Sequence, residues 1–437
     1  MKKLFLILSV ILFFFMPLDA SENMSLEQAI KDGLRMSGAY QNRFLSQKQA
    51  AIRLKQSSKN KLFHLELNAN YVYRSETMTV EFPGVQIPGM VSIPGQSFEA
   101  GLHHNYDVFL SLSQPLFTGG VLSNAVKTDK VREAVEMNQT ELEKSSLVGQ
   151  IKSSFFDYRI ALSRKKAAMS LHKKLELHSQ KLNDLFSEGL VQKTDLLETR
   201  ARLEETEMRI HECEQALDQI RIVFHQMCGH YPEEIDLDYQ EEGQTREQAF
   251  RYFQEHHPIL KTLQGQKKIF ELQRKSTEGR YLPTVNGFAE LHYGKPGIDF
   301  FEKEWTLYFQ GGVVLNVPVF KWNQRSKEGR IVDIQIQKLN NQRDDFIKEA
   351  SKNLNQLFSV KKALIQKIEN IENMKGYSQQ DAELKKALYQ EKQIPNKDYL
   401  AALQAEKKYD AMKNEVLLQI EKIKVKINTL ICRTKEY

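Results

Sequence analysis

The chain has 437 residues, of which 41% are hydrophobic and 27% are charged, and its mean hydropathy is −0.50. This composition is too polar for a bundle of membrane-spanning helices and too rich in aromatic residues for a disordered chain, so both classes are excluded. The 62 basic and 56 acidic residues give a net charge of +6 and are interspersed, which argues against a nucleic-acid-binding face. The length corresponds to about three domains or to one large repetitive body.

The first twenty residues have the pattern of an export signal. Lys2 and Lys3 precede an apolar run over residues 4–15, which is too short for a stable membrane anchor. Ala20 is a small residue of the kind found at a cleavage site. We therefore expect a cleaved signal peptide over residues 1–20; an uncleaved signal anchor is the alternative.

The remainder of the chain is a tandem repeat. Residues 25–30 align with residues 245–250 at an offset of 220, and both segments carry a capping box, Ser or Thr followed three residues later by Gln. Residues 114–117 align with residues 317–320 at an offset of 203. The difference of 17 residues falls within residues 73–115 of the first repeat, where three Pro-Gly pairs predict an exposed, turn-rich loop.

Each repeat is expected to fold as a helix, a β-hairpin, a very long helix and a return helix, which makes the chain an α+β membrane protein. The first repeat covers residues 21–237 and the second covers residues 238–437. The expected elements are strands at about 64–74 and 104–114, a long helix at about 120–186 and a return helix at about 195–228, then strands at about 284–293 and 304–316, a long helix at about 323–389 and a return helix at about 398–431.

The four expected strands alternate between apolar and polar residues. Leu65, Leu67 and Tyr71 in the first strand alternate with polar neighbours, and the other three strands repeat the pattern. Strands of about 9–11 residues with aromatic residues near their ends are typical of membrane barrels. A soluble hairpin with one face on a core is the alternative for any single pair of strands.

The two long helices have no proline and few glycines, and each would be about 100 Å long. The return helix of the first repeat has an apolar residue at every seventh position, which predicts a coiled-coil seam. The residues of this series are Leu196, Leu203, Ile210, Leu217 and Phe224. Cys213 falls in the parallel series, where we expect it to pack as a small hydrophobic residue and not as a reactive thiol.

Four strands cannot close a barrel, and lipid does not tolerate an open sheet edge. A membrane-embedded form must therefore pool strands from several copies of the chain. Three copies give twelve strands and room for an aqueous lumen, whereas two copies give eight strands, whose interior side chains can fill. The helical hairpins would then form a coiled-coil cylinder below the barrel.

With this pattern, the chain resembles the TolC-like outer-membrane efflux proteins over essentially its whole mature length. The motifs are "QPLFTGG" at residues 114–120, its counterpart "VPVFKWN" at residues 317–323, and "EGLVQKTDLLE" at residues 188–198. Two positions depart from the family pattern. Phe63 stands where the second repeat has Pro283, and Lys392 stands where the first repeat has the tip glycine.

The resemblance implies a homotrimeric channel, with a twelve-stranded barrel in the cell outer membrane and an α-helical barrel crossing the periplasm. It also implies docking to a periplasmic adaptor (membrane fusion protein) and an inner-membrane transporter, and passive efflux of small molecules. The same architecture serves type I protein secretion, which is an alternative cargo. A non-conducting coiled-coil envelope tether is the alternative from a different class.

Three acidic residues at the hairpin tips are candidates for a periplasmic gate: Asp195, Glu198 and Asp398. Their structural role would be to cap the return helices, with Asp195 and Glu198 as a capping box. Their functional role would be a ring of carboxylates that attracts cations at a constriction which opens for export. Ala401 stands where the family can have a second acidic residue, which puts a double ring in doubt.

The adaptor-docking candidates implied by the resemblance are Gly189, Leu190, Val191, Ile394 and Pro395. A glycine near a helix end is also a common C-cap, so both roles are open for Gly189.

Catalytic, cofactor and metal sites are not indicated. The three cysteines are odd in number and have the spacing of neither disulfide pairs nor metal ligands. The pairs His103-His104 and His256-His257 have no nearby carboxylate or cysteine cluster. No nucleophile elbow, phosphate loop or HExxH motif occurs, so we expect no enzymatic activity.

Overall fold

The computed structural model describes residues 24–86, 88–89, 92–299, 301, 303–391 and 393–434, and only the backbone of residues 406 and 407. The predicted signal peptide and Lys392 lie outside the described residues. The chain forms two compact units. The first unit contains the described residues up to Leu45, Asn138–Lys261 and the chain from Asp344 onward; the second contains Ser46–Met137 and Thr262–Arg343. Each unit therefore takes segments from both repeats.

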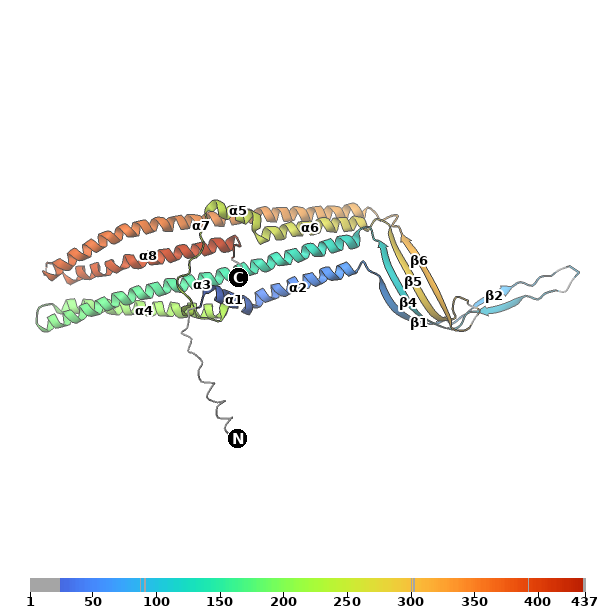
Figure 1. The fold of residues 1–437 in the computed structure, drawn as a ribbon, viewed down its shortest axis with the longest axis horizontal. Helices are drawn as coiled ribbons and strands as arrows, with labels where there is room; N and C mark the ends of the chain where they lie inside the picture. Colours follow the sequence, from blue (N-terminus) through green and yellow to red (C-terminus); the bar gives the residue numbers. More distant parts are fainter. Residues whose placement is uncertain are drawn as a thin grey trace, which may run out of the picture. The chain divides into compact units, whose positions relative to one another are not determined.

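The elements follow one another in the order expected for each repeat (Figure 1). The helices are α1 (Leu26–Met36), α2 (Gly38–Lys59), α3 (Val121–Ser187), α4 (Lys193–Cys228), the short 3-10 helix η2 (Pro232–Glu234), α5 (Arg246–His256), α6 (Pro258–Gly279), α7 (Gln324–Gln390) and α8 (Asn396–Leu430). The strands are β1 (His64–Tyr73), β2 (Met78–Phe82), β3 (Gln96–Ala100), β4 (His104–Phe117), β5 (Thr284–Lys295) and β6 (Thr306–Asn316).

The first helix of each repeat is divided in two, which the sequence pattern did not predict. Both α1 and α5 begin as expected, because Ser25 and Thr245 accept hydrogen bonds from the backbone N–H three residues ahead. Both end at a residue with an extended backbone, Ser37 and His257. In the second repeat the break has a clear cause, since Pro258 disfavours a helical conformation at the residue before it.

In the second unit, four strands form one antiparallel sheet in the order β1-β4-β5-β6. The pairing of β4 with β5 joins the two repeats. One face is apolar across all four strands, because the paired positions match in type. Its members include Leu65, Leu67, Tyr71, Val108, Leu110, Leu291, Tyr293, Leu307, Phe309 and Val313, all exposed. The other face carries polar residues such as Glu66, Asn68, Ser111, Glu290 and Gln310.

Part of the expected turn-rich loop is a second, two-stranded sheet. Strands β2 and β3 pair in antiparallel register, with Val80 opposite Phe98. The Pro-Gly pairs lie between these strands, and not throughout the insertion. The alternation of Met78, Val80 and Phe82 carries the strand signal that the turn residues obscured.

The motif that precedes each long helix fixes an unusual backbone. Gly119 and Gly120 have φ values of 59° and 81°, and Trp322 and Asn323, at the same positions of the second repeat, have φ values of 40° and 54°. At Gly119 a glycine is also required by space, because an added Cβ would lie 2.2 Å from the carbonyl oxygen of Gly279. The motif therefore makes the corner between the strand and the long helix.

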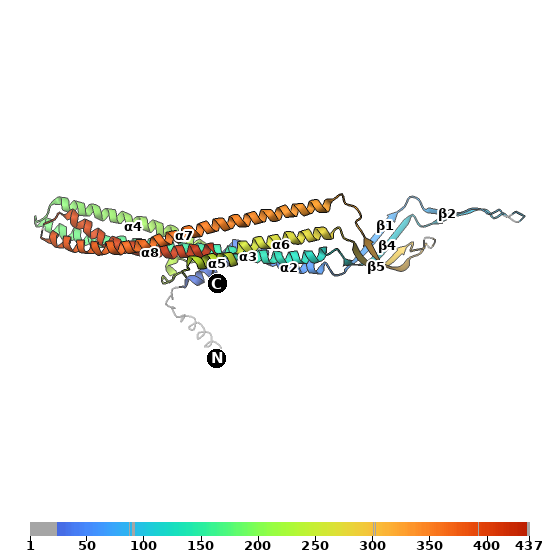
Figure 2. The same cartoon turned by 90° about the horizontal axis from the view of Figure 1, so that it is seen from above.

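The long helices α3 and α7 both have 67 residues, and each is shifted by one residue from its expected range. The return helices α4 and α8 begin two residues earlier than expected and run back beside α3 and α7 (Figures 1 and 2). Buried side chains join each pair: Leu217 packs on Tyr158 and Ala161, and Val416 packs on Ile371. Within the described residues, none of the helices combines the length and the apolar content that crossing a bilayer requires.

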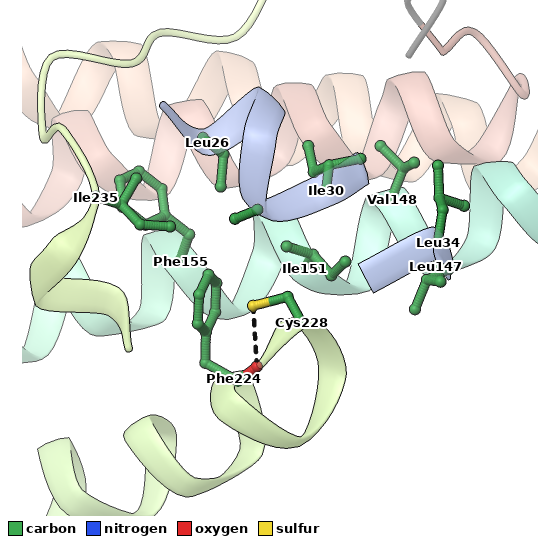
Figure 3. Close-up of a cluster of buried hydrophobic side chains, with 11 residues drawn as sticks. Leu26, Ile30, Leu34, Leu147, Val148, Ile151, Phe155, Phe224, Cys228 and Ile235 are labelled. Carbon is green, nitrogen blue, oxygen red and sulfur yellow. Dashed lines mark hydrogen bonds between the residues drawn. The ribbon is translucent and has the colours of Figure 1, made fainter. Parts of the chain in front are cut away.

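Among the described residues, the first unit has two larger hydrophobic clusters, one for each repeat, besides the small ones that join each helix pair. The first joins α1, α3, α4 and the segment after α4 through Ile30, Ile151, Phe155, Phe224 and Ile235 (Figure 3). The second cluster has equivalent positions at the two offsets seen in the sequence. Its buried residues are Ala249, Phe253, Ala350, Leu354, Ile427 and Ile431. These clusters hold the return helices and the segment between the repeats against the long helices.

Candidate functional site

The first chain reversal, between α3 and α4, is closed by Gly189. Its φ is 73°, and its N–H donates to the carbonyl of Phe186 at 3.0 Å. The N–H of Leu190 donates to the carbonyl of Leu185 at 2.9 Å. These two bonds form a Schellman motif, in which the left-handed residue is favourable only for glycine and a few others. Gly189 is therefore a helix C-cap residue.

The second reversal, between α7 and α8, repeats the hydrogen bond that spans five residues. The N–H of Gln393 donates to the carbonyl of Leu388 at 2.8 Å, and both residues match the Leu190–Leu185 pair at the offset of 203. Both reversals lie at the same end of the first unit (Figures 1 and 2). The two tips thus have a common backbone connection although their sequences differ.

The docking candidates of the sequence analysis all lie in these two turns. Leu190 is half exposed, at 50%, and Gly189 and Pro395 are exposed. Val191 and Ile394 are half-buried. The turns therefore present the apolar side chains of Leu190 and Pro395 to the surroundings.

The gate candidates do not cap the return helices as expected. The residues at the N-cap positions are Gln192 and Pro395, neither of which makes a side-chain capping bond. Asp195 and Asp398 lie in the first turn of α4 and α8, and Glu198 follows Asp195 within α4; all three are half-buried. An aspartate in the first helical turn is stabilised by the helix dipole, so the same residue type suits both positions. The expected capping box at Asp195 and Glu198 is wrong because α4 begins two residues before Asp195, at Lys193.

Asn396, the first residue of α8, joins the two repeats beside Asp195. It is 2% exposed, and its amide Nδ2 donates to the hydroxyl of Thr199 at 3.1 Å and to the carbonyl of Asp195 at 3.2 Å. Its Oδ1 lies 2.8 Å from Nε2 of His178 on α3. Since the amide nitrogen donates to α4, the oxygen accepts from His178, which fixes the histidine as the tautomer with a proton on Nε2. One side chain thus connects α3, α4 and α8.

Two tyrosines complete this cluster. The rings of Tyr389 and Tyr399 stack with centroids 4.8 Å apart, and His178 packs against both. Burial lowers the pKa of His178, and the hydrogen bond to Asn396 offsets part of this effect. Burial also raises the pKa of Tyr389, with a further contribution from the charge of Asp195. His178 is therefore neutral at pH 7, and the ends of all four helices are held together by packing and neutral hydrogen bonds.

Sequence reasoning missed both Asn396 and His178. At the offset of 203 they correspond to Lys193 and Asp381, so comparison of the repeats does not single them out. The only available signal was Asn396 itself, since asparagine is frequent at helix starts.

The remaining histidine and cysteine candidates have structural roles. His257 is buried against Cys432, with Nε2 3.5 Å from Sγ, and burial raises the pKa of the Cys432 thiol to about 11. The pair therefore lacks the thiolate that a reactive cysteine needs. Cys213 is half-buried in the helical seam. Among the described side chains, no group of three or more His, Cys, Asp or Glu residues could hold a metal ion.

One protein-family model matches part of the chain. Residues 41–230, from helix α2 to just beyond α4, match the model of the family described as outer membrane efflux protein. This segment is similar to the outer membrane efflux protein family. The resemblance noted in the sequence is confirmed, and the family is one of transport proteins and not of enzymes.

Solved structures extend the likeness over almost the whole chain. The fold is similar to that of the outer membrane protein VceC from Vibrio cholerae, with a TM-score of 0.72 and 12% identity over 93% of this chain and 95% of VceC. The Campylobacter jejuni CmeC outer membrane channel gives a TM-score of 0.70 and 13% identity, over 94% of this chain and 85% of CmeC. The Neisseria gonorrhoeae MtrE outer membrane channel, in its open state, gives 0.70 and 12%, over 93% and 88%. A search by sequence finds no match among curated proteins.

Proposed function

We propose that three copies of this efflux-family chain form a channel through the outer membrane, with their four-stranded sheets closing a twelve-stranded barrel. The observation that carries the proposal is the sheet: one face is apolar across all four strands, and β1 and β6 are its two edges. In lipid, an open edge would leave backbone groups without hydrogen bonds. Pairing β6 of one copy with β1 of the next removes both edges.

The polar face of the sheet, which would line the inside of the barrel, indicates the number of copies. The face opposite the apolar one carries Glu66, Ser111 and Glu290, which are suited to water. An eight-stranded barrel from two copies would pack such residues against one another, whereas twelve strands leave an aqueous lumen. A trimer therefore hydrates the polar face and exposes the apolar face to lipid.

We propose that the channel is a passive duct for small-molecule efflux, coupled to an inner-membrane pump through a periplasmic adaptor. The family match and the similarity to outer membrane channels support this function. The long helices would extend into the periplasm, after export directed by a cleaved signal peptide at residues 1–20. The chain would supply no energy of its own, since efflux would be driven by the partner pump.

The hairpin tips are the proposed gate and docking site. Asp195, Glu198 and Asp398, repeated in three copies, would place carboxylates around the periplasmic opening and attract cations there. The exposed turns would receive the adaptor through the docking residues Gly189, Leu190, Val191, Ile394 and Pro395.

A duct for type I protein secretion is the alternative cargo, because the pump and not the channel would select the substrate. A non-conducting envelope tether is the alternative class. The continuous apolar sheet face argues against a tether, which has no need of a surface suited to lipid.

The test is purification in detergent from the outer-membrane fraction, with the mass of the intact particle and its conductance in a planar bilayer. We expect a particle of about 150 kDa, three chains of 50.8 kDa less the signal peptides. Conductance should be low and should rise when Asp195 and Asp398 are replaced by alanine. Asp218→Ala, a loss of the same charge elsewhere on α4, is the control and should leave conductance unchanged. A soluble monomer or dimer that never inserts would reject the channel in favour of the tether.

A further inference from the structure

The ribbon formed by β2 and β3 has two different faces. Paired positions place the side chains of Met78, Val80, Phe82 and Phe98 on one face, where the rings of Phe82 and Phe98 meet edge to face at 5.8 Å. The opposite face carries polar side chains: Thr79, Glu81, Ser97 and Glu99. The ribbon is therefore amphipathic in the manner of a strand pair that packs one face on another body.

The apolar face is largely uncovered within the chain. Met78, Phe82 and Phe98 are 59%, 55% and 46% exposed. The ribbon is a separate two-stranded sheet among the described residues, and an isolated hairpin of this kind is at best marginally stable in water. A partner that covers these side chains would stabilise the ribbon by removing apolar surface from water.

The charge of the segment argues against a membrane surface as that partner. Residues 75–102 contain three glutamates (Glu76, Glu81 and Glu99) and no lysine, arginine or histidine. Segments that bind anionic lipid head groups are rich in basic residues, and acidic ones are repelled. An apolar partner without dense negative charge fits the ribbon better.

The connection of the ribbon to the main sheet points to other copies of the chain. β1 and β4 lead into β2 and β3, and at the junction the N–H of Arg74 donates to the carbonyl of His103 at 2.8 Å. β1 is the edge strand that pairs with the next copy in the proposed trimer. The ribbon thus continues the interface of the proposed trimer.

A row of aromatic residues lies at the end of the main sheet that adjoins the ribbon. Tyr71 contacts Tyr106, which contacts Trp305, which stacks on Tyr293 at 4.9 Å. Such belts lie at the boundary between membrane and water. In Figure 1, β2 lies beyond this end of β1 and β4, away from α2 and α6. The ribbon therefore belongs to the aqueous side of the barrel rim.

We propose that the apolar faces of the β2–β3 ribbons of three copies pack against one another and form an apolar collar at the barrel rim farthest from the helices. This inference rests on the proposed trimer. The collar would cover the exposed side chains, leave the glutamates facing water, and narrow the outer mouth of the channel with a hydrophobic ring.

Cysteine cross-linking of the full-length protein tests the collar. In a background with Cys213, Cys228 and Cys432 changed to alanine, Phe98→Cys and Met78→Cys each place a thiol on the apolar face. Treatment of the detergent-solubilised particle with a short bismaleimide should join copies through both positions. Ser97→Cys and Thr79→Cys, on the polar face of the same strands, are the matched controls and should cross-link at least tenfold less.

The outcomes separate the collar from the trimer. A particle of trimeric mass in which polar-face and apolar-face thiols cross-link equally, or not at all, rejects the collar and leaves the trimer intact. A monomeric mass rejects the trimer itself. A nitroxide attached to the thiol of the Phe98→Cys variant in lipid vesicles provides the second readout. Low accessibility to both oxygen and a water-soluble nickel complex is expected in the packed collar. High accessibility to oxygen with low accessibility to the nickel complex would place the ribbon in lipid and overturn the collar.

Discussion

The side-chain amide of Asn396 donates a hydrogen bond to the hydroxyl of Thr199 at 3.1 Å, across a sequence separation of 197 residues. Thr199 in turn donates to the backbone carbonyl of Asp195 at 2.9 Å. The second repeat therefore fixes the first turn of α4 in the first repeat, at the residue we propose as part of the gate. Any outward movement of one tip relative to the other must break these bonds or move both helix starts together.

Replacement of Asn396 by alanine should loosen both tips. The change leaves Nε2 of buried His178 and the hydroxyl of Thr199 without this partner, at a cost of about 1–3 kcal/mol per buried polar group. Hydrogen exchange measured by mass spectrometry should become faster in residues 178–200 and 389–400. Lys193→Ala, at the equivalent exposed position of the first repeat, is the control. Equal exchange in the two variants would show that Asn396 does not hold the tips.

Replacement of Gly189 by alanine tests the C-cap. Its φ of 73° costs a residue with a side chain about 1–2 kcal/mol, although no atom would contact the added Cβ. We expect faster proteolysis within residues 186–192. Gly376→Ala is the matched control, because Gly376 lies inside α7 with open space around it, and alanine there should be neutral or stabilising by about 1 kcal/mol. Equal protection in both variants would contradict the cap.

The two repeats could be predicted from the sequence in unusual detail because equivalent positions in both are buried in equivalent hydrophobic clusters. Ile151 and Phe224 in the first cluster correspond to Leu354 and Ile427 in the second, at the offset of 203. The long helices lie within one residue of their expected ranges, since corner residues of positive φ and tip turns end them at fixed points. Periodicity is informative where one face of an element is buried along its whole length.

The tip cluster could not be predicted, for two physical reasons. The bonds of Asn396 to His178 and Thr199 join different repeats, and neither repeat alone contains them. The starts of α4 and α8 lack a capping side chain, so the aspartates two residues further on carried the strongest signal and misplaced the helix start. Local patterns predict elements, whereas contacts between elements depend on tertiary packing.

Stability should fall in acid through His257. This residue is buried, and burial lowers its pKa to about 4 from the usual value of 6.5. Its Nδ1 accepts a hydrogen bond from the N–H of Ile259 at 3.2 Å, which requires the neutral ring. Above pH 6.5 both folded and unfolded states are neutral at this site. As the pH falls toward 4 the unfolded state gains a proton first, so stability is lost, by about 1 kcal/mol at pH 5.5.

Unfolding midpoints between pH 7.5 and pH 5.5 measure this effect. His257→Asn keeps an acceptor near Nδ1 but cannot titrate, so its midpoint should fall less with acidification than that of the native protein. His256→Asn, at the exposed neighbouring position, is the control and should retain the native dependence. If the two variants show the same dependence on pH, His257 is not the source.

Breaking the buried ion pair between Lys152 and Glu241 should strongly destabilise the first unit. Nζ lies 2.9 Å from Oε2, with side-chain exposures of 6% and 5%. Tyr239 and Asn428 also donate to the carboxylate, at 2.6 and 2.7 Å. Burial acts to raise the pKa of Glu241, but the charge of Lys152 and these hydrogen bonds outweigh it and hold the pKa below its usual value.

Replacing Lys152 by methionine should therefore leave a charged carboxylate without its cation, and should cost about 3–5 kcal/mol in unfolding by denaturant at pH 7.5. The double variant with Glu241→Gln should recover most of the loss, because it removes the charge and keeps an oxygen that accepts from Asn428. Since Glu241 lies in the segment that connects α4 to α5, the single variant should also speed hydrogen exchange in residues 229–245. A double variant as unstable as the single one would show that packing, and not the unpaired charge, sets the cost.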